Sequence, residues 1–152
     1  MTTFEHAIPR PAAMARTAAP ATLRAAGARA VGFAVIANVA LFALGAPLGF
    51  FPQDVLVPGA GAPIAVPNVI LDTVLGVAAG VGTLGLLRRY AARPQRTFRR
   101  VAYIALILSY TQPALVLQTA PLRMVFALNA LHTAAAAIAL WCLRGVGTTG
   151  SA

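Results

Sequence analysis

The chain has 152 residues, of which 59% are hydrophobic and 10% are charged. The charged fraction is less than half of the ~25% typical of soluble globular domains, so the composition argues against an ordinary soluble protein. All twelve basic residues are arginine and the acids number three, which gives a formal net charge of +9. A nucleic-acid-binding protein would place such charge on a polar face that water reaches. The single cysteine, Cys142, excludes an internal disulfide and a paired redox motif.

The amino-terminal region divides into a polar tail and a long apolar run. Residues 1–27 are rich in Ala, Pro and Arg and lack sustained apolar periodicity, so we predict a disordered cytoplasmic tail. Residues 30–51 carry no charge, and at ~1.5 Å per residue they are long enough for the ~30 Å hydrocarbon core of a bilayer. The run is also longer than the ~7–15 apolar residues of a signal peptide. It predicts a first transmembrane helix.

Three further apolar runs follow in the chain. They predict transmembrane helices at residues 69–87, 101–118 and 122–143. A Pro- and Gly-rich loop, residues 52–68, separates the first two spans. The sequence therefore predicts an all-α fold, a four-transmembrane-helix bundle formed by residues 28–144, followed by a short cytoplasmic tail at residues 145–152.

The arginines are distributed very unevenly between the two sides of this predicted bundle. Six of them lie in the segment LRRYAARPQRTFRR between the second and third spans, four precede the first span, and Arg144 follows the fourth. Only Arg123, at the outer end of the fourth predicted span, lies on the opposite side. The positive-inside rule then predicts both termini in the cytoplasm. We expect anionic lipids at the cytoplasmic arginine loop, and no nucleic acid.

Among the polar side chains inside the predicted spans, six are candidate site residues. They are Asn38, Asp72, Ser109, Gln112, Asn129 and His132. Counting ~1.5 Å per residue along each span places Asn38, Ser109 and His132 at similar depths near the bilayer midplane. A polar side chain that faces lipid loses its hydrogen bonds, so we expect these groups to point inward and pair with one another.

This polar layer has three interpretations. The one we favour is structural, with each pair joining two helices through a hydrogen bond. A proton or substrate pathway is the second, and His132 and Asp72 would be its titratable members. A metal or cofactor site is the third, but one histidine and one carboxylate are too few ligands, so we predict no metal and no cofactor.

Small residues mark a face of the second predicted span. Gly76 and Gly80 form the GxxxG motif GVAAG, and Asp72 and Thr83 fall on the same helical face. Glycines at this spacing let another helix approach closely. We expect the motif to serve helix packing within the chain more readily than dimerisation.

The segment RRYAARPQRTFRRVAYIALILSYTQPAL, followed after a short loop by LNALHTAAAAIAL, resembles a known family. It is an uncharacterised family of small four-span bacterial membrane proteins, domain of unknown function 6069. The resemblance covers about residues 30–143 and includes Asn38, the run from Arg96 to Phe98, and a histidine followed by small residues at His132. It implies an architecture and a membrane location, with no established activity. The small multidrug exporters are less similar, because they carry a glutamate in the region where this chain has Asn38.

No catalytic signature accompanies these features. The sequence contains no nucleophile and base pair, phosphate-binding loop or metal-ligand set, so we predict that the protein is not an enzyme. We expect an integral inner-membrane protein with a structural or accessory role, packing as a homo-oligomer or with a larger membrane complex. The alternative is a small dimeric transporter or proton-linked carrier that uses the polar layer of Asn38, Asp72, Ser109 and His132.

Overall fold

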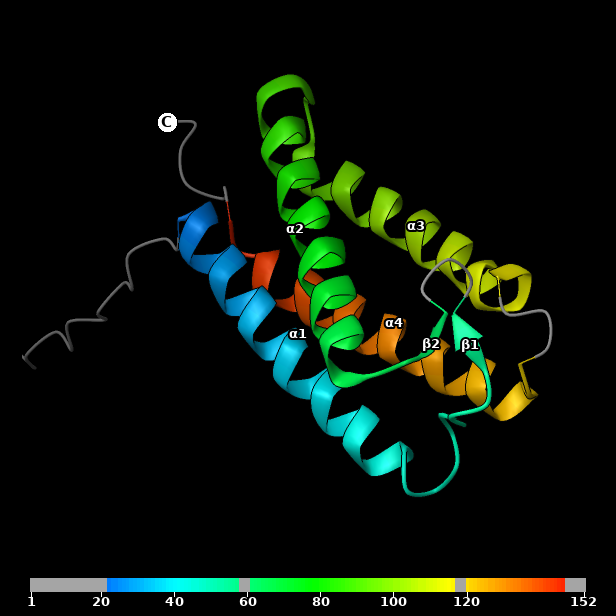
Figure 1. The fold of residues 1–152 in the computed structure, drawn as a ribbon. Coiled ribbons are helices and arrows are strands. Elements are labelled where there is room, and N and C mark those ends of the chain that lie inside the picture. Colours follow the sequence, from blue (N-terminus) through cyan, green and yellow to red (C-terminus); the bar gives the residue numbers. More distant parts are fainter. Residues whose placement is uncertain (1–21, 58–60, 117–119, 147–152) are drawn as a thin grey trace, which may run out of the picture.

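Four helices make up most of the described chain (Figure 1). The computed structural model describes residues 22–57, 61–116 and 120–146, with side chains 112–116 outside this description. The helices are α1 (Leu23–Gly45), α2 (Val66–Tyr90), α3 (Pro94–Val116) and α4 (Leu122–Leu143). Between α1 and α2, the short strands β1 (Leu56–Val57) and β2 (Ala62–Pro63) pair antiparallel, with Leu56 opposite Pro63. The fold of the described residues is therefore helical apart from one ribbon.

Helix α1 begins and ends earlier than the first predicted span. Thr22 Oγ1 accepts a hydrogen bond from the amide of Ala25 at 3.2 Å, which caps the helix, so residues 23–27 are helical and the predicted tail is too long there. The rest of that tail lies outside the described residues. The helix ends at Gly45 because Pro47 cannot donate a backbone hydrogen bond and Gly49 has a φ of 73°. Phe51 then folds back, with its ring centroid 4.6 Å from that of Phe42.

Helices α2 and α3 both extend into the predicted arginine loop. Helix α2 continues to Tyr90, so Arg88 and Arg89 lie in its last turn, where positive charge is favourable for the helix dipole. Helix α3 begins at Pro94, a residue well suited to the first position of a helix. The connection between the two helices is therefore shortened to residues 91–93. Helix α4 has the same bounds as the fourth predicted span.

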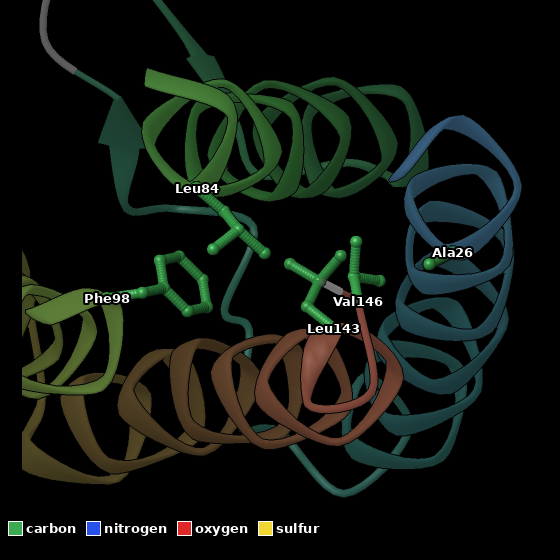
Figure 2. Packing of buried hydrophobic residues seen from close by; sticks show 5 residues of the cluster. All are labelled: Ala26, Leu84, Phe98, Leu143 and Val146. Atoms are coloured by element: carbon green, nitrogen blue, oxygen red, sulfur yellow. The ribbon is translucent and has the colours of Figure 1, made fainter. Parts of the chain in front are cut away.

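Helix α1 packs along α2 and α4, and α3 packs against α2 and α4 (Figure 1). The starts of α1 and α3 meet the ends of α2 and α4 in one apolar cluster, shown in Figure 2. Its buried members are Ala26, Leu84, Phe98, Leu143 and Val146. We call this the arginine end of the bundle, because it adjoins the arginine-rich termini of the helices.

The core continues from this cluster along the bundle. Ala30 and Ala34 of α1 pack with Val77 of α2 and Ala139 of α4 in the next cluster. Phe42, Phe51, Val69 and Leu131 form the third, and Val55 packs with Met124 at the far end, beside the ribbon. The buried residues of α1 recur every four positions, which places small side chains toward its neighbours.

Three helices are long and apolar enough to cross a membrane: α1, α2 and α4, with mean hydropathies of 1.8, 1.9 and 1.6. Among the described helices, α3 does not meet this criterion. Its first two turns carry Arg96, Arg99 and Arg100, and a polar run follows from Ser109 to Gln112. An all-helical protein with membrane-compatible helices is confirmed, whereas the count of four spans and their orientation stay predictions.

Candidate functional site

A buried hydrogen bond joins α1 to α2 near the middle of the bundle. Asn38 Nδ2 donates to Thr73 Oγ1 at 2.9 Å, and both side chains are buried, at 3% and 6% exposure. The Thr73 hydroxyl donates in turn to the carbonyl oxygen of Val69, at 2.6 Å. Asn38 Oδ1 is buried and accepts no hydrogen bond from the described residues. The amide is thus half satisfied, which gives the protein a buried acceptor in an apolar surrounding.

Thr73 was not among the predicted site residues, although its neighbour Asp72 was. The buried face of α2 consists of Val69, Thr73, Val77 and Leu84. Asp72 precedes Thr73 by one residue, which turns it about 100° around the helix axis, and it is exposed. The four-residue spacing of Thr73 from Val69 and Val77 is the sequence signal that could have identified it.

A second polar contact joins α3 to α4. Tyr110 Oη and Thr133 Oγ1 are 2.6 Å apart. Thr133 donates its one hydroxyl proton to the carbonyl oxygen of Asn129 at 2.7 Å, so Tyr110 is the donor in the contact between the two hydroxyls. The Asn129 side chain has a buried Oδ1 without a hydrogen-bond partner among the described residues. Neither Tyr110 nor Thr133 was among the predicted site residues.

The remaining predicted residues lie apart from these contacts. Ser109 Oγ donates to the carbonyl oxygen of Leu106 in its own helix, at 2.7 Å. His132 is half-buried on α4, and Asp72 is exposed on α2. Gln112 lies in α3, but its side chain is outside the described residues. None of the described hydrogen bonds joins two of the six predicted residues, so the expected pairing within that set is not seen.

The glycine motif of α2 does not pack against another described part of the chain. A Cβ atom built at Gly76 or at Gly80 would meet nothing within 4 Å. The expected use of these glycines within the chain is therefore wrong: they lie on the stripe next to the buried one. The close approach occurs at Gly27 of α1, where a Cβ would lie 3.1 Å from both methyl carbons of Val81.

Gln95 fastens the start of α3 to the end of α4. Its Nε2 atom donates to the carbonyl oxygen of Leu143 at 3.1 Å and to that of Val146 at 2.6 Å. Carbonyl groups at the end of a helix have no partner within the helix. The Leu143 carbonyl oxygen also accepts from the amide of Val146 at 3.3 Å, so Gln95 reinforces the turn that follows α4. No periodicity or motif singles out Gln95 in the sequence.

The described part of the chain contains no group of three His, Cys, Asp or Glu residues that could hold a metal ion. Its polar contacts between side chains are an amide and hydroxyl pair and a pair of hydroxyls. Such groups can join helices through hydrogen bonds.

The chain belongs to DUF6069, a family of unknown function, whose sequence profile matches residues 18–149. This confirms the resemblance inferred from the arginine-rich segment and the LNALHTAAAAIAL motif. No curated protein and no solved structure gives a significant match to the chain.

Proposed function

We propose that this member of DUF6069 is a four-span protein of the bacterial inner membrane with a structural or accessory role and no enzymatic activity. The observation that carries the proposal is the way its internal polar groups are used. Thr73, Ser109 and Thr133 each donate to a backbone carbonyl of their own helix, and the two described hydrogen bonds between side chains of different helices each join a single pair. This arrangement favours the joining of helices over a continuous relay.

Membrane residence is supported by the surface of the helices. Large apolar side chains are exposed on all four of them, for example Ile36, Leu75, Ile107 and Phe126. Water would make such a surface unfavourable, whereas lipid chains would cover it. The uncharged part of α3, residues 101–116, is about 24 Å long at 1.5 Å per residue. Its preceding arginines can extend toward the lipid head groups, which would let this helix act as a short fourth span.

The proposed orientation places the arginine end in the cytoplasm, where the positive-inside rule favours it. Single cysteines at Gly61 and at Ala92, in a Cys142→Ser background, test this orientation in intact cells. An impermeant thiol reagent should label the cysteine at position 61, which lies in the ribbon region, and should spare the one at position 92. Labelling at position 92 alone would indicate the opposite orientation. Labelling at both positions would contradict the proposed arrangement of spans.

A proton-linked carrier is the second candidate, because the titratable side chains Asp72 and His132 belong to α2 and α4, which pack against each other. Proteoliposomes with an imposed pH gradient and an internal pH-sensitive dye separate the two functions. Under the structural proposal, wild-type vesicles should lose their gradient no faster than protein-free vesicles. A wild-type flux that both His132→Gln and Asp72→Asn abolish, with unchanged protein incorporation, would establish the carrier and overturn the structural proposal.

A further inference from the structure

A cavity lies between α3 and α4 at the arginine end of the bundle. It is lined by Gln95, Phe98, Arg99, Leu140 and Arg144, and its volume is about 230 Å³. On α3, Phe98 and Arg99 follow Gln95 by three and four residues, so the three lie on one side of that helix. Arg144, which caps the end of α4, follows Leu140 by four residues and lies on the same side as Leu140. The double hydrogen bond from Gln95 to the carbonyl groups of Leu143 and Val146 holds the two sides together.

Two arginine residues, Arg99 and Arg144, line this cavity, and no carboxylate of the described residues lies nearby. Arg144 is held over the ring of Trp141, with its Cζ atom 5.7 Å from the ring centroid, and Arg99 is exposed. The carboxylates in the described ranges are Asp54, before β1, and Asp72, in the second turn of α2, and both belong to the opposite end. The cavity therefore carries two positive charges that an external anion can neutralise.

The rest of the lining is apolar. Phe98 is 4% exposed and forms part of the core cluster of Figure 2, and Leu140 packs against the same cluster. Trp141, next to Leu140, is exposed, which suits an aromatic ring at a membrane interface. The cavity is smaller than the ~300–1,000 Å³ of pockets that enclose a drug-sized ligand. It has room for a head group whose acyl chains stay in the bilayer.

We propose that this cavity binds the phosphate group of an anionic phospholipid, with Arg99 and Arg144 as the residues that contact the phosphate oxygens. Guanidinium groups donate paired hydrogen bonds to phosphate. Leu140 and Trp141 then border the glycerol and the first methylene groups of the lipid. The inference rests on the membrane location proposed above, and it adds a site on the protein that selects one class of lipid.

The test uses the full chain in detergent, titrated with phosphatidylglycerol or phosphatidylcholine and read by native mass spectrometry. Phosphatidylglycerol should bind more tightly than phosphatidylcholine. The double variant Arg99→Gln with Arg144→Gln should lower the affinity for phosphatidylglycerol about tenfold or more. The matched control, Arg88→Gln with Arg89→Gln, removes the same charge from the end of α2 and should lower it less than about threefold. Equal melting temperatures establish that both variants are folded.

Three results would overturn the inference. Equal losses of affinity in the two double variants would indicate diffuse attraction to the arginine end, without a site in the cavity. Equal binding of the two lipids would exclude recognition of a net negative head group. If inorganic phosphate displaces the bound phosphatidylglycerol and binds with the same affinity as that lipid, the cavity is a site for a free anion.

A separate measurement distinguishes failure of this inference from failure of the proposed function. Native membranes extracted with alkaline carbonate should retain the chain if it is an integral membrane protein. A retained chain without selective phosphatidylglycerol binding contradicts the lipid site alone. Release of the chain into the supernatant contradicts membrane residence and the lipid site together.

Discussion

Helices α1 and α3 have the same length, 23 residues each, but they join the bundle in different ways. Helix α1 buries a stripe of small side chains, Ala26, Ala30 and Ala34, against both α2 and α4. Helix α3 buries Phe98 near its start and exposes Tyr103, Ile104, Ile107 and Leu108. Its described links to α4 include the side-chain hydrogen bonds of Gln95 and Tyr110.

The difference teaches that apolar content and packing are separate properties of these helices. Small side chains let backbones approach closely, so a helix with an alanine stripe gains contacts along its length. The large apolar side chains on the outer surface of α3 make few contacts with the protein, so their burial would come mainly from lipid. We therefore expect α1 to be held by packing along its length, and α3 to depend more on a few polar contacts.

The largest effect should come from enlarging a side chain in the stripe of α1. Ala34 is fully buried, so Ala34→Leu should overpack the contact with α2 and α4 and reduce the free energy of unfolding by about 1–3 kcal/mol. The matched change on α3, Ala105→Leu, lies at an exposed position and should change it by less than about 0.5 kcal/mol. Denaturation in detergent measures both. Equal destabilisation would remove the proposed difference between the two helices.

An intermediate effect is expected from the buried hydrogen bond between α1 and α2. Thr73→Val keeps the shape of the side chain and removes the described partner of Asn38 Nδ2. We expect a loss of about 0.6 kcal/mol, and at most about 1.7 kcal/mol, from hydrogen bonds of this kind in membranes. The control is Thr111→Val on α3, whose exposed hydroxyl donates to the carbonyl oxygen of Leu108 in its own helix.

A double-mutant cycle sharpens that measurement, since Asn38→Leu removes the other partner. The effects of Thr73→Val and Asn38→Leu should be non-additive, because each variant already removes the shared bond. Additive effects would show that the contact contributes nothing. If Thr111→Val reduces the free energy of unfolding as much as Thr73→Val does, the buried hydrogen bond contributes no more to stability than the exposed one.

The smallest global effect should come from Tyr110→Phe, which removes the donor to Thr133 on α4. The contact is exposed, so the loss of unfolding free energy should be no more than about 0.6 kcal/mol. Hydrogen exchange should nevertheless rise in α3 and stay unchanged in α1, because the contact restrains α3. Uniform acceleration in both helices would indicate that α3 unfolds with the rest of the bundle.

The sequence by itself determined the helical regions, the family and the separation of charge along the chain. Each of these depends on residues close together in the chain or on their order. Apolar runs of sufficient length favour helices, and Leu122 to Leu143 forms α4 with the predicted bounds. The bounds of α1 and α3 were less well predicted, because Thr22 and Pro94 set the helix starts through local effects that hydropathy does not include.

The tertiary structure decided which face of each helix meets a neighbour. Counting residues places Asp72 and Thr73 at nearly the same depth, but the rotation of α2 buries Thr73 and exposes Asp72. The rotation of α2 likewise leaves space beside Gly80, whereas α1 and α2 approach each other closely at Gly27. Depth follows from the rise per residue along one helix, whereas burial depends on the rotation and position of all the helices that pack around it. Gln95 contacts carbonyl groups about fifty residues away, and no local pattern encodes that distance.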